Sequence, residues 1–213
     1  MPPVMIFLFN PVYAENIKYV NRPKSRKQSS SNFCASVLYS KKQEMGVTMR
    51  ILVFSDSHSG MGFMRYCVKT LSPNAIVHLG DYYDDAETIH EEYPMIPLYQ
   101  VPGNCDRYRC PPFASEILIL PVCGVPLYMT HGHRHQVKMT TSMLIRDARA
   151  SKVAAVLYGH THRAECYQED DGLWVMNPGS CGSWGGTVGL IEIEGNQIKN
   201  CRILNQMDVE EMK

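Results

Sequence analysis

From residue 49 onward, short apolar runs alternate with stretches in which apolar residues recur every three or four positions. A short apolar run bounded by turn residues predicts a buried strand, whereas the longer spacing predicts an amphipathic helix. The order of these elements is strand and helix in alternation, followed by a strand-rich second half, which predicts an α/β fold of two packed sheets with helices outside. The expected strands are residues 51–54, 75–79, 96–101, 116–120, 125–130, 152–158, 164–168, 173–176, 188–193 and 197–204, and the expected helices are 61–71, 84–92 and 140–151.

The first 48 residues do not share this pattern. Residues 22–31 are basic and serine-rich, a composition that favours disorder. The apolar start at residues 1–9 lacks the basic segment that opens a secretory signal. We expect residues 1–48 to be a disordered, dispensable extension, with a translation start at Met49 as a further hypothesis, and residues 49–213 to form the functional domain.

Composition narrows the class of protein without naming a function. The 213 residues include 21 basic and 21 acidic side chains, a balance that does not indicate a nucleic-acid or membrane surface. No apolar stretch approaches the ~20 residues of a membrane-spanning helix. The eight cysteines are scattered and form no Cys-x-x-Cys pair. This usage favours free thiols in a reducing cytoplasm over a secreted disulfide framework.

Ligand-type side chains follow five of the predicted strands, directly after each strand ends. In α/β sheets, binding sites form outside the carboxyl ends of the strands. Taken singly, each cluster also fits a turn, a helix cap or a surface loop, but their common place predicts one site. In extended backbone, residues two apart share a face, so the first pair is expected to point at one object. The side chains are Asp56 with His58, Asp81, Asn104, His131, and His160 with His162.

These seven side chains provide oxygen donors and imidazoles but no thiolate. Such donors suit manganese, iron or zinc better than copper(I) or an iron–sulfur cluster. Seven donors are too many for one tetrahedral ion, but they suffice for two ions if one carboxylate bridges them. Two metals roughly 3.5–4 Å apart can clamp the attacking and leaving oxygens of a phosphoryl displacement. The pattern therefore predicts a dinuclear site for phosphate-ester chemistry.

The five clusters, in this order, resemble the motifs of the calcineurin-like metallophosphoesterases, and their spacing is most similar to the YfcE-like phosphodiesterase branch. The resemblance covers about residues 49–204, and a later loop, Asn177-Pro178-Gly179-Ser180, is also similar to that branch. It implies a four-layer α/β/β/α sandwich of two mixed sheets. The motifs are Asp56-x-His58, Gly80-Asp81-x-x-Asp84, Gly103-Asn104-Cys105-Asp106, His131-Gly132-His133 and Gly159-His160-Thr161-His162.

The resemblance also implies two cation sites that share one carboxylate. Both ions would be divalent, with Mn²⁺ the first choice and Fe, Zn, Ni or Co as alternatives, and a metal-bound hydroxide would attack phosphorus. The first ion would be held by Asp56, His58 and His162, the second by Asn104, His131 and His160, and Asp81 would bridge them.

The candidate catalytic residues are Asn104, Cys105 and His131. Cys105 stands where many larger members of the superfamily carry a histidine that protonates the leaving group. Asp106 and His133 are other candidates for this acid. We expect Cys105 to tune substrate choice more than rate, because a diester with a good leaving group needs little help from an acid.

Charged residues beside the site loops each have two explanations. Asp84 either orients a ligand imidazole or simply lies on a helix. Arginine suits phosphate recognition, but exposed arginines are more often surface residues; the four concerned are Arg107, Arg109, Arg134 and Arg163.

The function expected from the sequence is that of a cytoplasmic, metal-dependent phosphodiesterase that acts on a phosphate ester. As in similar proteins, it would assemble as a dimer or tetramer. One alternative is a different two-metal hydrolase that cleaves phosphomonoesters or amides. Another is a non-catalytic scaffold or binding module. In such scaffolds the ligand positions are degraded, whereas all seven are intact here, and this favours catalysis.

Overall fold

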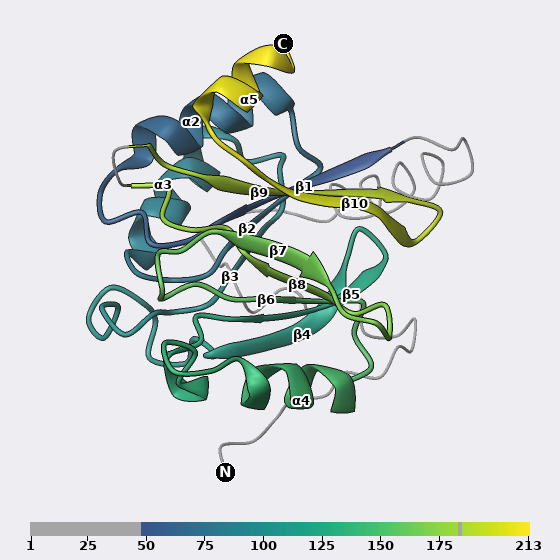
Figure 1. Ribbon diagram of the computed structural model, residues 1–213. Helices are drawn as coiled ribbons and strands as arrows, with labels where there is room; N and C mark the ends of the chain where they lie inside the picture. Colours follow the sequence, from purple (N-terminus) through teal and green to yellow (C-terminus); the bar gives the residue numbers. More distant parts are fainter. Residues whose placement is uncertain (1–47, 183–184) are drawn as a thin grey trace, which may run out of the picture.

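The computed structural model describes residues 48–182 and 185–213. The predicted extension, apart from residue 48, lies outside the described residues, and the division of the chain at residue 49 stays a prediction. In the part that is described, two five-stranded sheets lie face to face with helices on their outer sides (Figure 1).

The first sheet is built around the strand that opens the domain, β1 (Met49–Phe54). β1 pairs in parallel with β2, and β2 pairs in parallel with β3, while β9 and β10 extend the sheet in antiparallel fashion on the other side. The bounds of these strands are β2 (Ala75–His78), β3 (Leu98–Gln100), β9 (Val188–Glu194) and β10 (Gln197–Leu204).

The second sheet has the order β4-β5-β6-β8-β7 and is also mixed. β4 and β5 form a hairpin, and Cys123 and Gly124 at its tip both have positive φ, as a type I′ two-residue turn requires. β5, β6 and β8 then run parallel. The bounds are β4 (Ile117–Val122), β5 (Val125–Thr130), β6 (Ala155–Leu157), β7 (Glu165–Gln168) and β8 (Trp174–Asn177).

Alternation along the strands explains why the layers stack in this way. Ile51 and Val53 of β1 belong to the core between the two sheets, whereas Leu52 and Phe54 pack under the outer helices. Both faces of β1 are therefore buried, which is why its sequence is a continuous apolar run. The first sheet is covered by α2 (Met61–Leu71), α3 (Tyr83–Glu92) and α5 (Gln206–Glu211), and the second by α4 (Ser142–Ala150).

The four-layer α/β/β/α sandwich is thus confirmed, with element ends that differ from the predictions by a few residues. Two short elements were not expected: the 3-10 turn His133–His135 and the helix α5. The sequence did contain a signal for α5, because Asn205 and Asp208 form a capping box at its start. Among the described residues, no helix is long and apolar enough to cross a membrane.

Candidate metal centre

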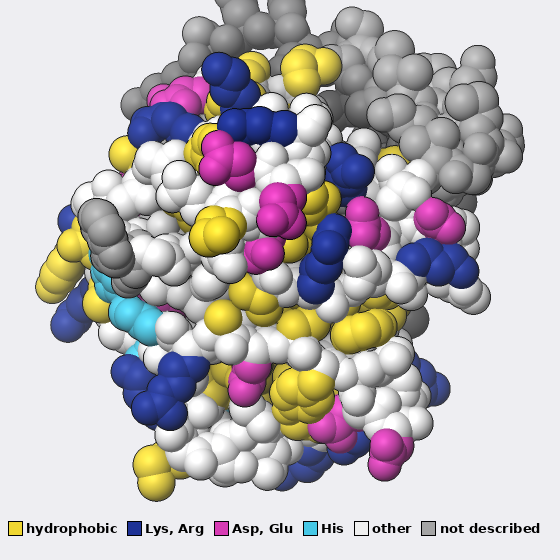
Figure 2. Space-filling model, turned by 45° about the horizontal axis from the view of Figure 1, so that its top comes forward, with side chains coloured by type: hydrophobic (Ala, Val, Ile, Leu, Met, Phe, Trp, Pro, Cys, Tyr) yellow, Lys and Arg dark blue, Asp and Glu magenta, His cyan; other side chains and the backbone are white. Residues whose placement is uncertain are grey.

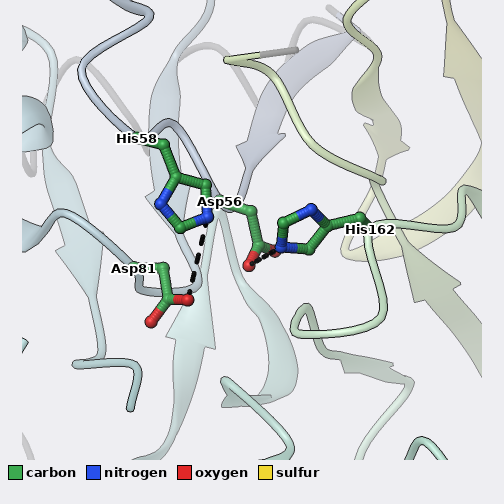
Figure 3. A group of neighbouring side chains, drawn as sticks. All are labelled: Asp56, His58, Asp81 and His162. Atoms are coloured by element: carbon green, nitrogen blue, oxygen red, sulfur yellow. Dashed lines mark ion pairs between the residues drawn. The ribbon is translucent and has the colours of Figure 1, made fainter. Parts of the chain in front are cut away.

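Four of the predicted ligand side chains meet where β1, β2 and β6 end (Figure 3). The ligand atoms of Asp56, His58, Asp81 and His162 all lie within 4.8 Å of one another. His162 Nε2 is 3.1 Å from Asp56 Oδ1, and His58 Nε2 is 3.9 Å from Asp81 Oδ2. Two carboxylates and two imidazoles at these distances form a donor set that fits a divalent cation.

The remaining predicted ligands gather around His131. Its Nε2 lies 3.2 Å from Asn104 Oδ1, 3.2 Å from His160 Nδ1 and 3.6 Å from Asp81 Oδ1. On the other side of the ring, Nδ1 is 2.7 Å from the carbonyl oxygen of Leu79. Because a carbonyl only accepts, Nδ1 carries the proton and Nε2 presents a lone pair. Lone pairs from one nitrogen and two oxygens therefore converge, an arrangement that a cation would stabilise.

Asp81 lies between the two groups, with one carboxylate oxygen near each. Oδ2 faces His58, while Oδ1 faces His131 and accepts the backbone N–H of Cys105 at 2.9 Å. Burial alone would raise the pKa of Asp81, but His131, the Cys105 N–H and His58 oppose it, and the net pKa is below its usual value. Asp81 is therefore a carboxylate at neutral pH, as a bridging ligand must be.

Two further observations fit a cation at this place. Asp56 is fully buried, and although His162 Nε2 lies 3.1 Å from its Oδ1, this oxygen accepts no hydrogen bond from the described residues. A buried charged oxygen of this kind is costly unless a cation or donor compensates it. Burial and the neighbouring His131 also lower the pKa of His160 to about 4, so its ring is neutral and can offer a lone pair at neutral pH.

The backbone of the ligand loops is not extended, contrary to the geometry expected for Asp56 and His58. Asp56 has φ 54° and His58 has φ 42°, both in the left-handed region. Asp81, His160 and His162 share this conformation, with φ between 58° and 68°. Non-glycine residues in such conformations cost about 1–3 kcal/mol each and persist only where the surroundings enforce them. Asp56 and His58 therefore converge on one group of donors through a sharp turn, whereas the turn after β6 directs His160 and His162 to different groups.

Hydrogen bonds join the ligand loops of the two sheets. The His131 ring, from the loop after β5, bonds to Leu79 in the loop after β2. The backbone N–H of His160, after β6, donates to Asp56 Oδ2 at 3.1 Å. Each sheet therefore contributes half of the site, and these contacts fix how the halves face each other.

A fully buried carboxylate, Asp106, holds two of the ligand loops together. Its Oδ2 accepts the backbone N–H groups of Asp81 and Gly103 at 2.8 and 2.7 Å, and its Oδ1 accepts those of Tyr82 and Tyr83 at 2.7 and 2.9 Å. These bonds also cap the start of α3. Because both carboxylate oxygens accept two backbone N–H groups each, Asp106 has a structural role, and this arrangement disfavours it as the general acid.

Asp85 has a similar role beside His58. It is buried, and its Oδ2 accepts the Ser57 hydroxyl at 2.7 Å and the Ser59 backbone N–H at 2.8 Å, on either side of His58. The sequence analysis overlooked this residue and did not assign this role to Asp106. In the sequence, both residues are acidic and lie within a few positions of a ligand motif. A polar contact between loops has no periodic pattern, however, so this position alone did not predict their role.

The other residues singled out near the site have mixed roles. Cys105 is exposed beside Asp81, and partial desolvation of its thiol together with that carboxylate raises the pKa of Cys105 to about 11. Asp84 lies on α3 and pairs with Arg109 at 2.8 Å, which agrees with its helix interpretation. Arg134 pairs with Glu116. Among the described residues, Arg107 and Arg163 have no acidic partner.

His133 lies close to the second group, with its ring centre 5.5 Å from that of His131. Its Nδ1 is buried without a hydrogen bond among the described residues, and burial lowers the pKa of the ring. It stays a candidate for the acid. On the face shown in Figure 2, histidine side chains reach the surface at one side with Lys and Arg side chains near them, and elsewhere basic and acidic side chains are interspersed.

Comparison with known proteins gives a consistent picture. A calcineurin-like phosphoesterase superfamily domain matches residues 49–196. A probable metallophosphoesterase from Mycoplasma pneumoniae is 28% identical over 134 residues, which is 62% of this chain and 78% of that protein. A phosphodiesterase from Methanocaldococcus jannaschii is 24% identical over 168 residues, 71% of this chain and 97% of that protein.

Solved structures agree on the fold. The Vps29 protein of Entamoeba histolytica, as a single mutant, superposes with a TM-score of 0.56 at 17% identity and covers 74% of this chain and 99% of its own. At this identity the likeness concerns the fold alone. Because the family match spans most of the sequence and all five of its motifs, this chain belongs to the calcineurin-like phosphoesterase superfamily.

Proposed function

We propose that this metallophosphoesterase is a phosphodiesterase that works with two divalent cations. The observation that supports two ions is the position of Asp81, whose two oxygens lie near two separate groups of donors. A single ion would need only one of these groups. The similarity to a phosphodiesterase from M. jannaschii supports a diester substrate.

In this proposal each group of side chains holds one ion. When bound, the two ions would supply Lewis-acid stabilisation of the phosphoryl oxygens and water activated for attack at neutral pH. The chain itself provides neutral imidazoles, an ionised Asp81 and a rigid set of loops. The first ion would be held by Asp56, His58 and His162, the second by Asn104, His131 and His160, with Asp81 shared.

Mn²⁺ is the proposed ion, and Fe, Zn, Ni and Co suit the same imidazole and carboxylate donors. The scaffold alternative stays open because the likeness to Vps29 concerns the fold alone and does not by itself favour catalysis. We favour catalysis because donors are present at every position of both groups. The cytoplasmic location and the dimer or tetramer stay predictions.

The test is metal analysis of the purified full chain, followed by assays after chelation and return of single metals. We expect about two ions per chain and hydrolysis of bis(p-nitrophenyl) phosphate well above that of p-nitrophenyl phosphate. Faster cleavage of the monoester would support the phosphomonoesterase instead. Metal binding without turnover on phosphodiesters, phosphomonoesters or peptides would support the scaffold.

Cys105→Ala is expected to change turnover of the activated diester by less than about threefold. The thiol holds its proton at neutral pH, and p-nitrophenolate leaves without needing an acid, so removal of the thiol should cost little. Cys105→His is expected to raise activity on the monoester, because an imidazole there could protonate a poorer leaving group. The measurement is kcat on both substrates, and a loss of most diester turnover in Cys105→Ala would contradict the expectation.

A further inference from the structure

Asn177, at the end of β8, bonds to the loop that carries two of the proposed ligands. Its side chain is fully buried. The amide nitrogen donates to the carbonyl oxygen of Gly159 at 3.0 Å and to the hydroxyl of Thr161 at 2.9 Å. The amide oxygen accepts the N–H of Gly179 at 2.9 Å, which fixes the orientation of the amide. A single buried side chain thus touches the loop on both sides of His160.

The same contacts also constrain His162. The hydroxyl of Thr161 accepts the backbone N–H of Arg163 at 3.2 Å and so closes the turn around His162. The same hydroxyl accepts the hydrogen bond from the Asn177 amide. His160 and His162 have φ of 68° and 58°, which this tethered turn must enforce. A free loop would relax toward commoner conformations and move both rings.

The segment after Asn177 reaches the other half of the site. The Ser180 hydroxyl donates to the carbonyl oxygen of Asp56 at 2.7 Å, and the Cys181 N–H donates to the carbonyl oxygen of Ser55 at 3.1 Å. Residues 177–181 therefore connect the β6 loop with the β1 loop. Both loops supply ligands to the proposed first ion, so their spacing depends on this segment.

We propose that Asn177 is a positioning residue that sets the affinity of both cation sites through the Thr161 hydroxyl. Among the described residues, its side chain makes no hydrogen bond to a ligand side chain; it orients the turn from which His160 and His162 project, one toward each group of donors. The inference rests on the proposed function, because it concerns the same two ions. Partners that orient ligands in this way typically account for 10–100-fold in metal affinity.

The test uses Asn177→Asp, which keeps the size of the side chain and the acceptor for Gly179 but removes both donated hydrogen bonds. Mn²⁺ titration of the chelated full chain by calorimetry should show affinity reduced about 10–100-fold. The matched control is Asn205→Asp, the same chemical change at the cap of α5, where an aspartate also accepts the two N–H groups. It should bind Mn²⁺ as the wild type does.

Thr161→Val tests whether Asn177 acts through the Thr161 hydroxyl, and it provides the test of the proposal if Asn177→Asp does not fold. It removes the hydroxyl without changing the shape of a half-buried side chain, and its loss of affinity should be similar. Thr161→Ser, which keeps the hydroxyl, should bind Mn²⁺ within about threefold of wild type. If both positions act through one bond, the double variant should lose no more affinity than the worse single variant.

The outcomes separate this inference from the proposed function. A wild type that binds neither Mn²⁺ nor any of Fe, Zn, Ni and Co overturns both. A wild type that binds Mn²⁺ while Asn177→Asp and Thr161→Val bind equally well overturns only the role of Asn177. A lower melting temperature of the chelated variants with unchanged Mn²⁺ affinity also overturns it, because Asn177 would then stabilise the fold without positioning the ligands.

Discussion

Asp106→Asn is expected to lower the free energy of unfolding by about 2–6 kcal/mol. The carboxylate accepts four backbone N–H groups, two at each oxygen, in a fully buried place. An amide has one oxygen, so its NH₂ group would face two donors, and each buried donor left without an acceptor costs about 1–3 kcal/mol. Against a total stability of about 5–15 kcal/mol, this is a large fraction. Urea denaturation of the metal-free chain measures it.

The control for this change is Asp208→Asn, which alters an exposed carboxylate that accepts one backbone N–H, that of Asn205. The amide keeps one oxygen that can accept this N–H, so the change should cost about 1 kcal/mol or less. If Asp106→Asn and the control have the same free energy of unfolding, the four hydrogen bonds of Asp106 contribute little to stability. Asp106 also joins the loops of Asp81 and Asn104, so its variant should bind Mn²⁺ more weakly even where it is fully folded.

The layers of the fold could be predicted because they depend on periodic burial. β1 is buried on both faces and therefore appears as a continuous apolar run, and helices such as α2 show the expected spacing of buried residues. Gly195 and Asn196, between β9 and β10, have the positive φ that a two-residue hairpin turn needs, and glycine and asparagine are the residue types that adopt it most readily. The short helix α5 was missed because six residues carry too little periodicity.

The site could be predicted in outline because parallel strands bring their carboxyl ends to one edge. Ligand-type residues far apart in sequence, such as Asp56 and His162, are therefore neighbours in space. The local geometry could not be predicted. Asp56 and His58 adopt left-handed φ because Asp85, Ser180 and backbone contacts hold their loop, and such contacts depend on the complete fold.

A common design follows from these contacts. In four of the five loops that carry proposed ligands, a buried polar side chain holds the backbone and leaves the ligand atoms free; the loop of His131 is the exception. Three of these side chains, Asp106, Asn177 and Ser180, stand in stretches that the resemblance already singled out, and their hydrogen bonds offset the cost of the left-handed turns. The site is therefore preorganised by the protein. The buried holders are Asp85 for His58, Asp106 for Asp81 and Asn104, Ser180 for Asp56, and Asn177 for His160 and His162.

Asp81→Asn is expected to reduce diester turnover by about a thousandfold or more. The amide keeps an oxygen that can accept the Cys105 N–H, so the loop should hold its shape. It loses the negative charge that would be shared by both ions, and several kcal/mol of charge stabilisation in the transition state correspond to roughly three powers of ten in rate. The measurement combines kcat on bis(p-nitrophenyl) phosphate with the number of Mn²⁺ ions bound per chain, which should fall below the wild-type value.

The matched control is Asp171→Asn, the same change in an exposed ion pair with Arg149, and its turnover should stay within about twofold of wild type because surface ion pairs contribute little. A variant at Asp81 that binds fewer ions and loses turnover supports the shared carboxylate. If Asp81→Asn bound as many ions as wild type and kept its turnover, neither a bridging role nor a dinuclear mechanism through this residue could stand. Loss of turnover with full ion occupancy would instead assign Asp81 to substrate orientation.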